Sequence, residues 1–127
     1  MKIYIASHNQ RIARRLAGVL KRAGHEITAH WLNQPFGPSN AFDETTCWRF
    51  ANENFDDVRR SDALVLMAGP EKYSGGKFVE TGYAHALGKH VLILGRRENV
   101  QCYGNHMKQV RTRAELCAAL SSPNEKR

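Results

Sequence analysis

One stretch of the sequence, residues 62–95, has the pattern of a strand, a helix and a second strand. It begins with an unbroken apolar run over 63–68, passes through a turn region at 69–76 and a segment of helical spacing at 78–87, and ends with a second apolar run over 91–94. Strands that are apolar at every position are typical of parallel sheets covered by helices on both faces. The stretch therefore predicts a βαβ unit with a right-handed crossover.

The rest of the sequence alternates between the same two patterns. We expect further strands at residues 3–6, 26–31 and 107–110, and helices at 10–23, 43–60 and 112–120. The last helix begins with Thr112 and Glu115, which have the spacing of a capping box. The helix at 43–60 is expected to bury one face, which carries Trp48, Ala51, Phe55 and Val58.

This alternation predicts an α/β protein with a single doubly wound domain. We expect a five-stranded, mainly parallel sheet in the flavodoxin-like order 2-1-3-4-5. The domain should span residues 1–120, and residues 121–127 should form a flexible C-terminal tail. A chain of 127 residues with 42% hydrophobic residues is large enough for one buried core.

Composition argues against several classes of protein. No apolar stretch is long enough to span a membrane, and the N-terminus lacks the features of a signal peptide. The three scattered cysteines indicate reduced thiols, so a cytoplasmic location is expected. There is no dinucleotide-binding glycine motif, no Walker loop and no zinc-ligand spacing. We therefore expect neither a cofactor nor a metal.

The formal net charge of +7 permits nucleic-acid binding without establishing it. In the first predicted helix the arginines and lysines fall mostly outside the apolar stripe, as they do on an ordinary solvated face. Nucleic acid is therefore an unlikely partner. A positive field would still attract a phosphorylated small molecule.

The loop and helix of the central unit hold the most informative acidic residue, Glu80. The residue follows Ser74, Gly75 and Gly76 and falls in or near the first turn of the helix. Free backbone N–H groups and the helix dipole there favour anions, and we expect them to keep Glu80 ionised. The same loop could hold a phosphate. An acid in a first turn also serves stability alone, and that alternative remains open.

Other loops are expected at the same edge of the sheet. Ser7 and His8 follow the first strand, where open α/β sheets bind their ligands, and are candidate substrate contacts. Trp31 and Phe36 could stack on a base, or could pack in the core.

Several motifs resemble the nucleoside 2-deoxyribosyltransferase family, which includes nucleotide N-glycosidases. The motifs are Lys-Ile-Tyr-Ile-Ala at 2–6, Arg-Ser-Asp at 60–62, Gly-Lys-Phe-Val-Glu-Thr-Gly-Tyr-Ala at 76–84 and Ala-Leu-Gly-Lys at 86–89. The resemblance covers most of the chain and weakens between Leu32 and Asn52. It implies cleavage of an N-glycosidic bond or 2-deoxyribosyl transfer, on a deoxynucleoside or its 5′-monophosphate. Glu80 would be the nucleophile, and Tyr4 would orient its carboxylate.

The sequence departs from the family at two positions. Asn54 stands where the family usually has an Asp that holds sugar hydroxyls or assists departure of the base, although Asp56 and Asp57 are near enough to substitute. Ser74 resembles the N-glycosidase members, in which a Ser contacts the 5′-phosphate, rather than the transferases. These departures leave an alternative, namely a weakly active or inactive nucleotide-binding module with the same fold.

The resemblance also implies an assembly. Asn105 and Met107 stand where transferases place an Asn and a Met that reach a neighbouring subunit's site, so a homodimer or larger homo-oligomer is expected. A turn Asn and a core Met are the alternative interpretation of these residues.

Overall fold

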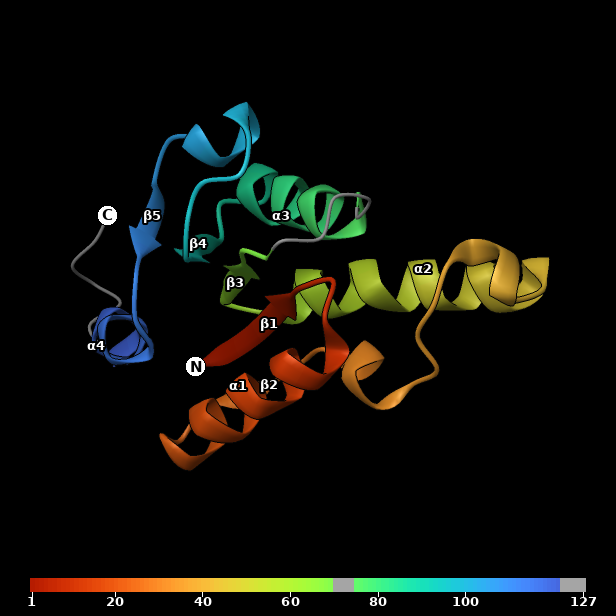
Figure 1. The fold of residues 1–127 in the computed structure, drawn as a ribbon, viewed down its shortest axis with the longest axis horizontal. Helices are drawn as coiled ribbons and strands as arrows, with labels where there is room; N and C mark the ends of the chain where they lie inside the picture. The colour runs from red at the N-terminus through yellow and green to blue at the C-terminus, as the bar shows by residue number, and fades with distance from the viewer. Residues whose placement is uncertain (70–74, 122–127) are drawn as a thin grey trace.

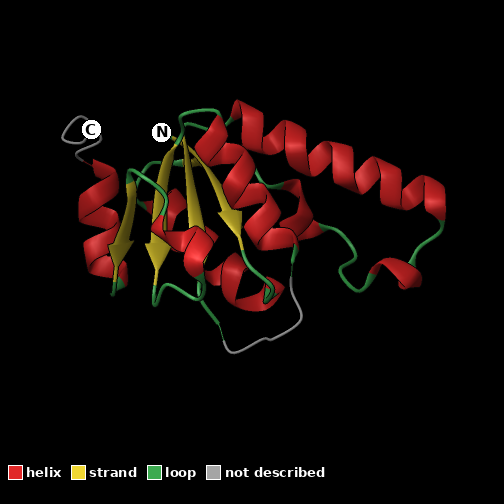
Figure 2. Cartoon of the chain, turned by 90° about the horizontal axis from the view of Figure 1, so that it is seen from above, coloured by secondary structure: helices red, strands yellow, loops and turns green. Residues whose placement is uncertain are grey.

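The computed structural model describes residues 1–69 and 75–121, and it contains one five-stranded sheet. All neighbouring strands pair in parallel, in the order β2-β1-β3-β4-β5, which confirms the expected order. The strands are β1 (Lys2–Ala6), β2 (Glu26–Ile27), β3 (Ala63–Met67), β4 (His90–Leu94) and β5 (Met107–Val110). Their arrowheads point the same way, so their carboxyl ends form one edge of the sheet (Figure 2).

Helices cover both faces of this sheet. Helices α2 and α3 lie on one side, and α1 and α4 lie on the other (Figure 1). The α-helices are α1 (Gln10–Arg22), α2 (Glu44–Arg60), α3 (Gly76–Ala86) and α4 (Arg113–Ser121), and short 3-10 helices lie at η1 (His30–Asn33), η2 (Ser39–Ala41) and η3 (Val100–Tyr103). None of the helices in residues 1–69 and 75–121 is long and apolar enough to cross a membrane.

Side-chain caps fix where three helices begin. Asn9 and Asp43 accept hydrogen bonds from backbone N–H groups in the first turns of α1 and α2. The expected capping box of α4 is confirmed: the Glu115 N–H donates to Thr112 Oγ1 at 3.0 Å, and Glu115 Oε1 accepts from the Thr112 N–H at 3.2 Å. These local bonds explain why the sequence placed the helices well.

The core is built on the three central strands. Every residue of β3 is buried, as are Ile3 to Ala6 of β1 and the middle of β4. The two sheet faces therefore hold apolar side chains throughout, as the unbroken apolar runs predicted. At the end of β4, Gly95 has a φ of 112°, and a Cβ on it would lie 2.8 Å from the Ala68 Cβ, so only glycine fits there.

Two expectations about the elements are wrong. The second strand was expected at 26–31, but β2 ends at Ile27 and the chain then turns into η1. Trp48 was expected on the buried face of α2, but it is 68% exposed, and Ala51 is also exposed. Figure 1 shows the reason: the N-terminal half of α2 projects beyond the sheet. The expected flexible tail lies, apart from Ser121, outside the described residues.

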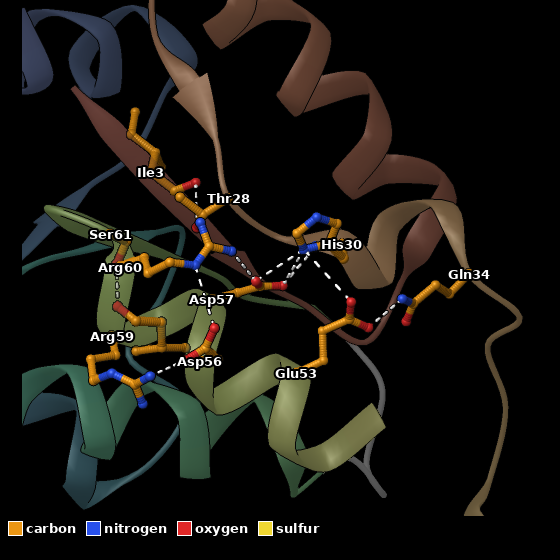
Figure 3. Close-up of polar contacts among 11 residues, drawn as sticks. Ile3, Thr28, His30, Gln34, Glu53, Asp56, Asp57, Arg59, Arg60 and Ser61 are labelled. Atoms are coloured by element: carbon orange, nitrogen blue, oxygen red, sulfur yellow. Dashed lines mark hydrogen bonds and ion pairs between the residues drawn. The ribbon is translucent and has the colours of Figure 1, made fainter. Parts of the chain in front are cut away.

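A polar network fastens η1 to α2 (Figure 3). The buried Asp57 carboxylate accepts from the His30 backbone N–H at 2.9 Å, lies 3.0 Å from His30 Nδ1, and also pairs with Arg60. One turn earlier on α2, Glu53 accepts a hydrogen bond from Gln34. The network thereby fixes the segment that follows β2 against the helix that faces it.

Candidate active site

A cavity of about 900 Å³ opens at the carboxyl ends of the central strands. The loop after β1, the segment after η1, the first half of α2 and the start of α3 all contribute to it. This is the edge at which open α/β sheets bind ligands. Its described lining residues are Ser7, His8, Trp31, Gln34, Pro35, Phe36, Gly37, Pro38, Ser39, Phe42, Cys47, Phe50, Ala51, Asn54, Gly75, Gly76, Lys77 and Glu80.

Glu80 lines this cavity from α3, just past the first turn of the helix. Because α3 begins at Gly76, Glu80 lies in the second turn, where its backbone N–H is already used within the helix. Burial raises the pKa of its carboxyl to about 7, and an interaction with the Tyr4 hydroxyl offsets this only in part. We expected the helix start to help keep Glu80 ionised, but the pKa of its carboxyl is raised instead, and burial is the main cause.

Tyr4 lies beneath Glu80 in the middle of the sheet. Its side chain is fully buried, and its pKa lies far above the ordinary value because of burial and then the charge of Glu80. The two groups are close enough to shift each other's pKa. Within the described residues, however, the Tyr4 hydroxyl makes no hydrogen bond of normal geometry. The resulting pair is a carboxyl beside a phenol hydroxyl that interacts with it without a hydrogen bond of normal geometry.

Asn54 reaches the same cavity from α2. Its Oδ1 atom is buried and has no hydrogen-bond partner among the described residues. The two nearby acids do not take its place. Asp57 is held by His30 and Arg60, and Asp56 is directed to Arg59 and Arg60. The neutral amide is therefore the α2 group that faces a ligand.

Loop residues predicted at this edge are brought together as expected. Ser7 and His8 line the cavity, and Ser7 Oγ also accepts from the Asn9 N–H at 3.0 Å. Gly75 and Gly76 line it at the start of α3, where no side chain caps the helix. Ser74 lies outside the described residues.

Aromatic side chains form the wall that faces these polar groups. Trp31 is buried and donates its Nε1–H to the Ile5 carbonyl at 2.9 Å, so it packs rather than faces a ligand. Phe36 packs on Trp31, with ring centroids 5.2 Å apart, and stays 46% exposed. Phe42 and Phe50 meet edge-on at 5.4 Å. Sequence reasoning missed this second pair, since no periodicity joins a loop residue to a helix residue.

A buried ion pair supports the start of α3. Lys77 Nζ lies 2.7 Å from Glu98 Oε1 and donates to the Met67 carbonyl at 3.2 Å, and both charged side chains are buried. Sequence reasoning missed this pair because its members lie in different elements and share no motif. Lys77 is the only lysine among the described lining residues, and Glu98 already balances its charge.

Asn105 and Met107 lie away from the cavity of their own chain. Asn105 is exposed, and its carbonyl lies 2.8 Å from His85 Nε2. Met107 begins β5 and is buried in the core. Among the residues that the structure describes, no cluster of His, Cys, Asp and Glu could hold a metal ion.

Comparisons with known proteins find one matching family and several similar folds. Residues 3–116 match the family described as nucleoside 2-deoxyribosyltransferase. Among curated proteins, none matches the sequence. A 2-deoxyribosyltransferase from Bacillus psychrosaccharolyticus has a similar structure, with a TM-score of 0.70 and 21% identity over 91% of this chain and 90% of that chain.

Two further solved structures share the fold. A CMP N-glycosidase from Clostridium botulinum gives a TM-score of 0.64 at 15% identity, over 95% of this chain and 99% of that chain. A conserved protein from Enterococcus faecalis V583 gives a TM-score of 0.69 at 17% identity, over 97% of this chain and 98% of that chain. At such identities these likenesses establish the fold.

Proposed function

The chain belongs to the nucleoside 2-deoxyribosyltransferase family, and on that premise we propose that it cleaves the N-glycosidic bond of a deoxynucleoside or its 5′-monophosphate, with Glu80 as the nucleophile. The sugar then passes to water or to an acceptor base. One similar structure is named as a 2-deoxyribosyltransferase and another as a CMP N-glycosidase, so both outcomes have a precedent on this fold.

The observation that carries the proposal is a half-buried carboxyl facing an open cavity. Cleavage at the anomeric carbon builds positive charge on the sugar, and a facing carboxylate stabilises that charge or attacks to form a glycosyl ester. Glu80 fits this role because it lines the cavity, is only partly exposed, and has a pKa raised by desolvation. With a pKa of about 7, it is largely ionised only above neutral pH, so kcat/KM should rise with pH up to about 7 and then level off.

Tyr4 and Asn54 fit supporting roles. The Tyr4 hydroxyl has a hydrogen to donate and no competing partner among the described residues, so a small shift of the carboxylate on substrate binding would let it donate to Glu80. The free Asn54 Oδ1 can accept a hydrogen bond from a sugar hydroxyl. A substrate would thus pair with the Asn54 Oδ1 directly, and its binding would bring the Glu80 carboxylate to the Tyr4 hydroxyl.

The remaining lining suggests how the two ends of the substrate are held. Phe36, Phe42 and Phe50 offer faces and edges for a flat base. Ser7, Gly75 and Gly76 lie on the polar side, where N–H groups at the start of α3 would meet the 5′ end of the sugar. A bound 5′-phosphate would depend on these backbone groups and on Ser74, because Lys77 is paired with Glu98.

One observation favours a second function. Asn54 cannot carry the charge or the proton of the Asp that is usual at this place, so the chain could be a weakly active or inactive nucleotide-binding module. Saturable binding of a nucleotide without any turnover would favour that function over catalysis.

The test is a turnover screen of deoxynucleosides and their 5′-monophosphates, with and without a free acceptor base. On every substrate cleaved, Glu80→Gln should lower turnover by about 10³-fold or more, because the amide neither attacks nor offsets the cation. Tyr4→Phe should be milder, roughly ten- to a thousandfold, because the nucleophile remains. Mass spectrometry of protein quenched during turnover should find a deoxyribosyl adduct on the peptide that contains Glu80. Full turnover by Glu80→Gln would rule out this nucleophile.

A further inference from the structure

One histidine of the candidate active site is free to act on a ligand. His8 lines the cavity from the loop between β1 and α1, and its ring meets Phe36 edge-on with centroids 5.9 Å apart. Neither of its ring nitrogens has a hydrogen-bond partner within residues 1–69 and 75–121. By contrast, His25 is bonded to the N-terminal amine, His30 to Asp57, and His85 to the Asn105 carbonyl.

The proposed reaction needs a proton donor that the rest of the described lining does not supply. A nucleobase leaves far more readily when it takes up a proton as its bond to the sugar breaks. Asn54 stands where the family usually has an acid, and its amide cannot transfer a proton. The acid must therefore come from another element of the cavity.

The other titratable groups of the described lining are already engaged. On α3, Lys77 is paired with the buried Glu98, and Glu80 is the proposed nucleophile. On α2, the Cys47 thiol is directed to the Ser39 carbonyl at 3.4 Å. The segment from Trp31 to Ser39 contributes no charged side chain to the lining. His8 remains, and a base packed against Phe36 would lie within reach of its imidazole.

We propose that His8 is the acid–base residue of this site, an assignment that rests on the proposed function. As a Glu80 oxygen bonds to the anomeric carbon, the bond from that carbon to the base nitrogen breaks, and its electron pair stays on the base. The imidazolium of His8 gives its proton to the base and becomes neutral. In the second half, neutral His8 takes a proton from the attacking water or acceptor base, whose new bond to the anomeric carbon releases the Glu80 carboxylate.

The test compares two donors with the native protein and with His8→Gln, which keeps hydrogen-bonding capacity but cannot transfer a proton. One donor is the deoxynucleoside cleaved fastest in the turnover screen. The other is a nitrophenyl 2-deoxyriboside, whose leaving group departs without a proton. His8→Gln should lower kcat/KM about 10²- to 10⁴-fold on the deoxynucleoside and less than about tenfold on the nitrophenyl donor.

A control variant and a stability measurement complete the test. His25→Gln, which changes a histidine far from the cavity, is the matched control and should leave both donors unaffected. Equal urea midpoints for native protein and His8→Gln would show that the fold is intact.

Several outcomes would overturn the assignment. Equal losses on the two donors would make His8 a binding residue, and an unchanged rate on the deoxynucleoside would remove it from the reaction. If Glu80→Gln kept full turnover while His8→Gln lost turnover only on the deoxynucleoside, Glu80 would not be the nucleophile. The assignment of His8 as the acid would then stand without the proposed function. Failure of the native protein to cleave either donor would overturn the proposed function and this assignment with it.

Discussion

Burial gives Glu80 two opposite effects at the scale of a single residue. A carboxylate that has lost its hydration is a stronger nucleophile, but it is also harder to ionise and destabilises the fold when it is charged. The pKa of about 7 expresses both effects. The sequence pattern and the family resemblance identified Glu80 as a candidate nucleophile. They did not predict the direction of its pKa shift, because that depends on strands and helices that close over the residue from elsewhere in the chain.

The first prediction concerns stability and pH. In the folded protein Glu80 holds its proton up to about pH 7, against 4.5 for an unperturbed carboxyl, so its contribution to stability falls as pH rises between these values. Such a shift corresponds to roughly 3 kcal/mol. Glu80→Gln should therefore be more stable than the native protein at pH 8, with the gain vanishing below about pH 4.5. Urea unfolding at both pH values measures this, and a gain that does not vary with pH would contradict it.

The second prediction concerns Asn54. Restoring an acid with Asn54→Asp places a proton donor on the α2 side of the cavity. Turnover of a deoxynucleoside should rise by about tenfold, and the double variant His8→Gln, Asn54→Asp should regain part of what His8→Gln alone loses. Steady-state rates of the three variants measure both effects. No gain in either background would show that the site has no use for an acid at position 54.

At the scale of the elements, the segment from η1 to η2 shapes the aromatic wall of the cavity, and the buried Asp57 carboxylate is one of the groups that hold its start. Asp57 fixes the His30 backbone, and His30 begins the 3-10 helix that carries Trp31. The side chains that follow, Gln34 and Phe36, line the cavity. The contacts that set this aromatic wall are therefore made largely outside the cavity, on α2, on α1 through Gln10, and on β1 through Ile5.

The third prediction tests this fastening. Asp57→Asn should destabilise the protein by roughly 1 to 3 kcal/mol, because the buried amide can no longer accept all the hydrogen bonds from His30 and Arg60. Its neighbour Asp56 is 45% exposed and pairs with arginines on the surface, so Asp56→Asn should cost less than about 1 kcal/mol. Urea unfolding compares the two variants. Similar losses for both would mean that the network does not fasten η1.

The same network explains which elements the sequence could predict. Unbroken apolar runs and local caps placed β1, β3, β4 and the four α-helices well. The chain after Ile27 has residues that suit a strand, but His30 bonds to Asp57 and Trp31 bonds to Ile5, and both contacts are distant in sequence. Trp48 shows the same limit, because helical spacing cannot reveal that the end of α2 extends beyond the sheet.

At the scale of the whole molecule, several large apolar side chains remain uncovered by the single chain. Trp48, Val79, Val100 and Tyr103 are each more than half exposed. We propose that they contribute to a homo-oligomer, in which Asn105 approaches a neighbouring cavity while Met107 supports it from the core.

The fourth prediction tests the assembly. Light scattering at micromolar concentration should give at least a dimer. Glu80→Gln lacks the nucleophile and Asn105→Ala lacks the group offered to the neighbour, so mixing the two weak variants should form hybrids with some intact sites and restore part of the turnover. A monomer, or a mixture no more active than its components, would remove the shared site.

The unpaired Tyr4 hydroxyl, together with Glu80, bears on the history of the chain. Each of these buried groups lowers the stability of the fold, and each could be relieved by one substitution, to Phe or to Gln. A lineage under selection for folding alone would drift toward such replacements, since they are accessible and stabilising. We therefore expect a chain that carries both groups at one site to use them in a reaction.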